Sequence, residues 1–268
     1  MNLTPFTAFW NKDYRTSTGK SLKRYLQSLN SSLSDKLGIT DENSYSKNGI
    51  YFADDCFITL RNLGFLKDPL FIKAVGPRSS DKVLMGRIWR LWFISWSLSV
   101  KWSSQGIILD LGTYNGKAMF TACKYAHLKN IDIPLSDQKI VLADIFENPP
   151  KEARKADHSS TLHVEVQELF QAFSNKIIAK GFIPNSISNV NFSDGIKWCQ
   201  IDLNSAESDL NGFRYIYDNL LPGAHVIFDD YGFSRYESTQ KAINKYLEDK
   251  TEVIFELPTG QGLLIKSN

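Results

Sequence analysis

The C-terminal part of the sequence, from residue 106 onward, alternates apolar strand-like runs with helix-like segments. Alternation of this kind predicts βαβ units, and therefore a mostly parallel sheet with helices on both faces. The last two apolar runs are joined by Thr259-Gly260-Gln261, which is too short for a parallel crossover and predicts an antiparallel hairpin at the sheet edge. The expected strands are 106–112, 139–145, 176–181, 196–203, 224–230, 252–258 and 262–267, and the expected helices lie near 117–128, 161–174, 206–220 and 235–249.

The first 80 residues have weaker patterns. Segments 16–38 and 52–66 each have a helical rhythm, and the first of them ends at a glycine. We therefore predict a small helical cap formed by residues 1–80, followed by a single α/β domain over residues 81–268.

A tryptophan-rich segment, residues 87–102, is the one stretch that resembles a membrane span. Arg87, Arg90 and Lys101 interrupt it, and it falls short of the run of about 20 apolar residues that a span requires. Its aromatic residues recur at helical spacing, which marks one apolar face. We predict a helix packed on the core and no membrane span. An aromatic surface here is also compatible with a homodimer.

The bulk composition is that of an ordinary globular protein. The net charge of +2 is too small to indicate a nucleic-acid partner. Three cysteines are an odd number without metal-type spacing, which suits a reducing compartment, and the start MNLTPFTAFW lacks the pattern of a signal peptide. We expect a cytoplasmic protein with no nucleic-acid partner.

The segment ILDLGTYNGKA, residues 108–118, joins the first strand of the α/β region to its helix. It places Asp110, Gly112 and Gly116 in the pattern acidic-x-Gly-x-x-x-Gly. Glycine lets the backbone approach a ligand closely, and a helix start offers free N–H groups. Asp110 would attract an ammonium group and repel a pyrophosphate, and the dinucleotide and phosphate-loop patterns are both absent. A tight turn with a purely structural role is the alternative.

Asp144 closes the second strand of this region. In nucleotide-binding α/β folds an acidic residue at this place takes the ribose hydroxyls. A helix cap or a turn former is the alternative. Together, Asp110 and Asp144 favour an adenosine-containing ligand that carries an amino acid, as S-adenosylmethionine does.

The carboxyl ends of the central strands are unusually acidic. In a doubly wound sheet the ligand crevice lies beyond these ends, so Asp110, Asp202, Asp229 and Asp230 should gather at one rim. Carboxylates that lie close together repel one another, and oxygen ligands without histidine or cysteine suit Mg²⁺. We predict a Mg²⁺ site formed by Asp202, Asp229 and Asp230. The alternative is that these residues form turns or cap helices.

Taken in order, the motifs resemble the macrocin O-methyltransferase-like (TylF-type) group of class I S-adenosylmethionine-dependent methyltransferases. The resemblance covers roughly residues 85–268. It rests on ILDLGTYNG, ADIFENPP, KGFIPNSI, QIDLNSAESDL, LLPGAHVIFDDYG and LPTGQGLLIK. It implies a Rossmann-like seven-stranded sheet and methyl transfer to a hydroxyl of a small-molecule or glycan acceptor, such as a sugar, a natural product or a polysaccharide.

The resemblance also implies a role for individual residues. The cofactor would be held at its methionine part by Asp110, Gly112, Tyr114, Asn115 and Gly116, at its ribose by Asp144, and near its adenine by Gly181 and Phe182. Mg²⁺ would be held by Asp202, Asp229 and Asp230, of which Asp202 and Asp230 are the expected catalytic residues.

One departure from the family pattern concerns the general base. The family often has Asp-x-Asp where this chain has Asp202-Leu203-Asn204, and an amide cannot take a proton. Either the base lies elsewhere or a metal alone acidifies the hydroxyl. Two other functions therefore stay open: a nicotinamide-dependent oxidoreductase on a similar sheet, and a non-catalytic binding protein that retains the methyltransferase fold.

Overall fold

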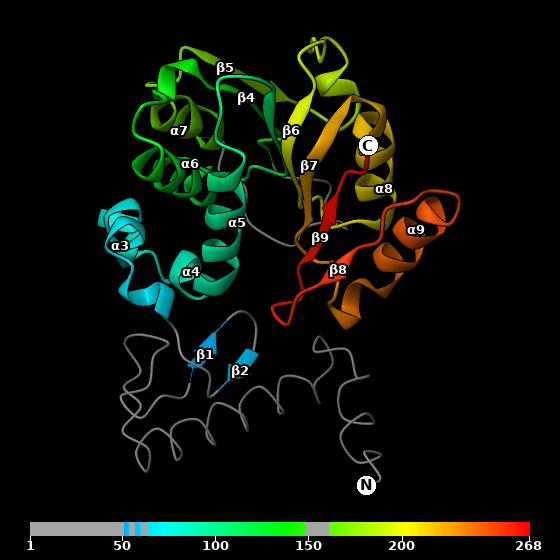
Figure 1. The fold of residues 1–268 in the computed structure, drawn as a ribbon, viewed down its shortest axis with the longest axis horizontal. Helices are drawn as coiled ribbons and strands as arrows, with labels where there is room; N and C mark the ends of the chain where they lie inside the picture. The colour runs from blue at the N-terminus through cyan, green and yellow to red at the C-terminus, as the bar shows by residue number, and fades with distance from the viewer. Residues whose placement is uncertain (1–50, 54–56, 60–63, 148–160) are drawn as a thin grey trace, which may run out of the picture.

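The computed structural model describes residues 51–53, 57–59, 64–147 and 161–268, so the segment 16–38 lies outside the described residues. Its main element is a seven-stranded sheet of order β5-β4-β3-β6-β7-β9-β8 (Figure 1). The first five strands in this order are parallel, and β9 and β8 are antiparallel, which confirms the predicted α/β sheet with its C-terminal hairpin. The strands are β3 (Ile107–Leu111), β4 (Lys139–Asp144), β5 (Asn175–Lys180), β6 (Ile196–Ile201), β7 (Leu220–Phe228), β8 (Phe255–Glu256) and β9 (Gly262–Ile265).

Helices cover both faces of the sheet (Figure 1). Successive side chains of a strand point to opposite faces, so Ile108 joins one buried cluster and Leu109 joins the other. The first cluster includes side chains of α3, α5, α6 and α7, and the second includes side chains of α8 and α9. The helices are α3 (Pro69–Val75), α4 (Lys82–Met85), α5 (Ile88–Val100), α6 (Lys117–Lys129), α7 (Leu162–Leu169), α8 (Ala206–Ile216) and α9 (Glu237–Leu247).

The tryptophan-rich segment forms α5, and its predicted packing on the core is confirmed. Leu91, Ile94 and Leu98 recur at helical spacing and are buried in the first cluster. Trp92 stacks on the Phe65 ring at 5.5 Å, whereas Trp96 remains 39% exposed. Phe93 joins the buried cluster with these aliphatic residues, whereas Trp89 and Trp92 pack against the cluster and are only partly buried. No helix in the described ranges is long and apolar enough to cross a membrane.

The predicted helix over 52–66 is wrong. Strands β1 (Tyr51–Ala53) and β2 (Phe57–Thr59) pair antiparallel within that range, with Tyr51 opposite Thr59. Aromatic and β-branched residues favour strands, and this local preference outweighed the helical rhythm. Among the described residues the first α-helix is α3, where the Asp68 carboxylate accepts from the N–H groups of Leu70 and Phe71 at 2.8 and 3.2 Å.

A buried hydrogen bond ties α5 to the sheet and gives a test of this packing. The Trp198 indole N–H donates to Ser97 Oγ at 2.6 Å, and both side chains are fully buried. Ser97→Ala leaves the indole N–H without an acceptor, so we expect the free energy of unfolding, measured by urea denaturation, to fall by about 1–3 kcal/mol. Ser99→Ala is the control, because Ser99 Oγ donates only to the Trp96 carbonyl of its own helix turn. Equal losses in the two variants would contradict this account.

Candidate functional site

A cavity of about 340 Å³ lies beyond the carboxyl ends of β3, β6 and β7, and the first turn of α5 forms one of its walls. This is the position predicted for the ligand crevice. Of the predicted site residues, the cavity is lined by Asp110, Gly112, Tyr114, Asn115, Asp202 and Asp229. Gly116, Asp144, Gly181, Phe182 and Asp230 do not line it.

The loop after β3 is shaped by two glycines. Gly112 has φ of +98°, and a Cβ atom there would lie 2.0 Å from the Asp202 carbonyl oxygen, so only glycine fits. The Asp202 N–H donates to the Leu111 carbonyl at 2.8 Å, which holds the ends of β3 and β6 together. Gly116 has φ of +69° and begins α6, where a Cβ would press on Phe170 at 3.1 Å. The loop geometry thus requires the glycines that the sequence pattern contains.

The Asp144 carboxylate holds this loop through hydrogen bonds with backbone N–H groups. One of its carboxylate oxygens accepts from the Tyr114 N–H at 2.8 Å, and the other accepts from the Phe146 N–H at 2.9 Å. Tyr114 and Phe146 both have positive φ, at 51° and 48°, which non-glycine residues adopt only when other contacts hold them. The carboxylate therefore fixes the backbone that lines the cavity. Its predicted contact with a ribose stays a prediction.

Gly181 and Phe182 follow β5 and lie beyond the cavity wall. The Gly181 N–H donates to the Asp144 carbonyl at 2.9 Å, which places this turn beside the end of β4. Phe182 is 66% exposed, so its ring is accessible at the surface. This exposed ring is the structural observation in favour of the predicted adenine contact, which stays a prediction.

Asp110 is buried at the cavity wall, with only 3% of its surface exposed. Burial raises the pKa of its carboxyl to about 7, and the nearby charges of Asp202 and Asp144 add to this effect. A buried carboxyl of this kind is only partly ionised near neutral pH. A ligand ammonium group would stabilise its ionised form.

The residue opposite Asp229 is an arginine from α5. Arg90 Nε donates to Asp229 Oδ1 at 3.3 Å, Arg90 Nη2 forms an ion pair with Asp229 Oδ2, and the same nitrogen donates to the Asp229 carbonyl at 3.2 Å. The amide of Gln261, from the C-terminal hairpin, donates to Asp229 Oδ1 at 3.0 Å. All three side chains are buried. Three segments far apart in the sequence therefore meet at one carboxylate.

The expected three-carboxylate metal site is not assembled. Both oxygens of Asp229 already accept from Arg90 or Gln261, and Asp230 Oδ1 lies 3.5 Å from Arg90 Nη2. Within the described residues no group of three acidic, histidine or cysteine side chains is placed to hold a metal ion. The sequence correctly identified a clustered charge that needs a cation, but a guanidinium from the chain itself lies there.

Asp202 faces the cavity and is held by a polar chain. Asn204 Nδ2 donates to Asp202 Oδ1 at 2.9 Å, and Tyr236 Oη donates to Asn204 Oδ1 at 2.6 Å. Burial, followed by the charge of Asp230, raises the pKa of Asp202 to about 6, against the opposing charges of two arginines. Asn204, which departs from the family pattern, thus orients the carboxylate beside it.

Arg90 and Gln261 are the site residues that the sequence analysis missed. The available signal was the spacing of Arg90 with Leu91, Ile94 and Leu98, which places one arginine on the buried face of the helix. A charged residue on such a face needs a partner. Gln261 carries no comparable signal, because it lies in a turn.

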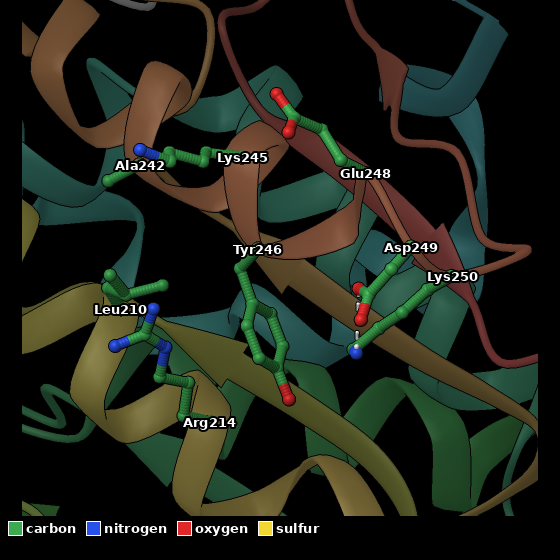
Figure 2. A pocket seen from close by; sticks show the side chains of 8 residues that line it. All are labelled: Leu210, Arg214, Ala242, Lys245, Tyr246, Glu248, Asp249 and Lys250. Carbon is green, nitrogen blue, oxygen red and sulfur yellow. Dashed lines mark hydrogen bonds and ion pairs between the residues drawn. The ribbon is translucent and has the colours of Figure 1, made fainter.

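A second hollow, of about 430 Å³, lies between α8 and α9 (Figure 2). Tyr246 is at its centre, flanked by the Arg214 guanidinium at 5.3 Å and by Lys250 Nζ at 4.5 Å from its ring. These are surface cation–π contacts, and none of the predicted site residues lines this hollow. The site is therefore assigned to the cavity at the carboxyl edge of the sheet.

The comparisons with known proteins agree with this architecture. No protein-family model and no curated protein matches the sequence. The solved O-methyltransferase NovP has a TM-score of 0.55 at 18% identity, over 69% of this chain and 82% of its own. The apo structure of CalS11, a TDP-rhamnose 3'-O-methyltransferase of calicheamicin biosynthesis, has a TM-score of 0.53 at 14% identity, over 78% of this chain and 97% of its own. The S-adenosylhomocysteine (SAH)-bound methyltransferase PaMTH1 of Podospora anserina has a TM-score of 0.51 at 13% identity, over 75% of this chain and 88% of its own.

The chain has the fold of these methyltransferases. At such identities the likeness concerns the fold alone, so the chemistry has to be argued from the residues of the cavity.

The raised pKa of Asp110 can be tested through the pH dependence of ligand binding. Because the folded state raises the Asp110 pKa to about 7, the proton is held more tightly in the folded chain, and ionisation of Asp110 destabilises the unliganded fold as the pH rises toward that value. An ammonium ligand requires the ionised form, so its binding below about pH 7 must displace a proton. We expect the affinity for SAH, measured by calorimetry, to fall by up to about tenfold per pH unit below about pH 7.

Asp110→Asn is the matched variant for this titration. Its neutral amide cannot ionise, so its weaker SAH affinity should no longer depend on pH in this range. The same pH slope in wild type and Asp110→Asn would show that another group titrates.

Proposed function

We propose that this chain is an S-adenosylmethionine-dependent O-methyltransferase of the macrocin O-methyltransferase-like (TylF-type) group. The observation that carries the proposal is the cavity itself: a glycine loop and a buried carboxylate, Asp110, lie at the carboxyl end of β3 in a methyltransferase sheet. Support comes from the SAH-bound PaMTH1 and from the O-methyltransferase NovP, which have the same fold.

The described residues fit the cofactor. Asp110 offers a buried carboxylate to the ammonium group of its methionine part, and the open backbone at Gly112 allows close approach. Tyr114 and Asn115 line the same wall, while Asp144 and the exposed Phe182 lie on the side proposed for the adenosine. When bound, S-adenosylmethionine supplies an activated methyl group, so the protein has mainly to position the acceptor oxygen. Such positioning can contribute about 7–11 kcal/mol.

Asp202 is the proposed general base. Methyl transfer from the cofactor to a hydroxyl would release the hydroxyl proton, so a group beside the acceptor oxygen would have to take it. Asp202 faces the cavity, its pKa of about 6 leaves it ionised near neutral pH, and Asn204 holds one of its oxygens by a hydrogen bond. Asp230, the other predicted catalytic residue, does not line the cavity and would act on Asp202 through its charge. A general base typically contributes about 10²–10⁴-fold to the rate.

The acceptor is proposed to be a hydroxyl on a sugar or natural product. CalS11, which shares the fold, is described as a TDP-rhamnose 3'-O-methyltransferase. Arg87 lines the cavity, is exposed, and forms no ion pair with any residue in the described ranges. A free cation at the rim suits an acceptor that carries a negative group, as a nucleotide-linked sugar does.

The Mg²⁺ ion implied by the family resemblance does not fit these residues as a three-carboxylate site. Asp229 would have to release Arg90 and Gln261 before it could coordinate a metal. Cellular setting and assembly remain proposals: buried free thiols at Cys123 and Cys199 support a reducing cytoplasm, and the half-exposed Trp96 supports a homodimer.

The general base can be tested by an isosteric change. Asp202→Asn removes the proton acceptor and keeps the shape, so we expect turnover to fall by about 10²–10⁴-fold while SAH affinity stays within a few-fold of wild type. SAH formation would be followed with a panel of nucleotide-linked sugars and glycosides. Asp218→Asn, an exposed change distant from the cavity, should leave turnover unchanged. Full activity of Asp202→Asn on an acceptor used by wild type would remove Asp202 from this role.

A further inference from the structure

We infer that Arg90 is the resident cation of this site and that Asp202, Asp229 and Asp230 bind no divalent metal ion. This inference deepens the proposed function and rests on it, because it assigns how the acidic end of the methyltransferase cavity is neutralised. The family resemblance implies a Mg²⁺ site at these three carboxylates, and the inference contradicts that implication.

The first support is the hydrogen bonding of Asp229. The planar guanidinium of Arg90 meets both carboxylate oxygens, which is the fork geometry that arginine forms with a carboxylate. Gln261 donates a further hydrogen bond to Oδ1. A metal ion bound to Asp229 would have to compete with three N–H donors, two of which belong to the positively charged guanidinium of Arg90.

The second support is the burial of Arg90. Only 3% of this residue is exposed, its guanidinium lies 5.2 Å from the centre of the Phe233 ring, and its helix is packed against the core at Leu91 and Ile94. An arginine on the surface could swing aside to admit a metal. Here the displaced guanidinium would have to remain in a buried setting without its carboxylate, which is strongly unfavourable.

The third support is electrostatic. Arg90 Nη2 pairs with Asp229 and lies 3.5 Å from Asp230 Oδ1, so its positive charge already stands beside two of the three predicted metal ligands. A dication placed between Asp202 and Asp230 would lie beside the guanidinium that already contacts Asp229 and Asp230. Arg90 therefore supplies part of the neutralising charge that a metal would bring and opposes the binding of another cation.

The test uses Mn²⁺ as a paramagnetic substitute for Mg²⁺. The full chain, saturated with SAH, would be titrated with Mn²⁺ and the free ion measured by electron paramagnetic resonance. We expect wild type to bind no stoichiometric Mn²⁺ at millimolar concentration, and its melting temperature not to respond to Mg²⁺. Stoichiometric Mn²⁺ binding by wild type that is lost in Asp230→Asn would overturn the inference.

The complementary arm removes the resident cation. Arg90→Met leaves the three carboxylates without the guanidinium, so this variant should gain Mn²⁺ binding and a rise in melting temperature with Mg²⁺. Both gains should disappear in the double variant Arg90→Met, Asp229→Asn. Arg214→Met is the control and should gain neither, because Arg214 lies against Tyr246 in the hollow between α8 and α9 and does not line this cavity. Folded Arg90→Met that binds no Mn²⁺ would contradict the claim that Arg90 excludes the metal.

Two cases remain: an Arg90→Met variant that does not fold, and a wild-type protein that does not bind SAH. If Arg90→Met does not fold, the wild-type titration decides alone: absence of bound Mn²⁺ supports the inference and site-specific binding overturns it. The SAH titration made beforehand separates this inference from the proposed function. A protein that fails to bind SAH refutes the methyltransferase proposal, whereas a protein that binds both SAH and Mn²⁺ refutes only the role of Arg90.

Discussion

The ion pair between Arg90 and Asp229 is the interaction on which the site depends. It joins the first turn of α5 to the end of β7, two elements 139 positions apart, and Gln261 adds the C-terminal hairpin to the same carboxylate. Removing one partner of a buried pair leaves an uncompensated charge, which typically costs about 3–5 kcal/mol. The pair thus closes one wall of the cavity and determines what remains available inside it. Asp229 is engaged by this pair, whereas Asp202, which also lines the cavity, has no ion pair among the described residues.

The remaining charges of the cavity are arranged around this pair. Asp110 and Asp202 both line the cavity, and burial raises the pKa of each carboxyl. The negative charges of the two carboxylates are compensated differently. A ligand ammonium would pair with Asp110, whereas Asp202 accepts a hydrogen bond from Asn204 and lies near the positive charges of two arginines. In the proposed function, these two carboxyls would lie at the cofactor end and the acceptor end of the cavity.

Much of this arrangement could be predicted from the sequence, because periodicity and strand ends are local properties. The parallel sheet, the terminal hairpin, the glycine loop and the gathering of aspartates all follow from short segments. The partner of Asp229 could not be located in this way, since Arg90 comes from a helix whose placement across the strand ends is a tertiary property. The pair β1 and β2 was predicted as a helix for another reason. A short segment with both helical rhythm and strand-forming residues can form either structure, and its tertiary surroundings determine which one it forms.

The central claim is that the cavity binds the methyltransferase cofactor without a metal ion. Calorimetric titration of SAH into protein treated with EDTA tests it most directly. Binding at one SAH per chain with micromolar affinity, unchanged when Mg²⁺ replaces EDTA, is the predicted result. Absence of binding under both conditions, or binding only when Mg²⁺ is present, would contradict the account.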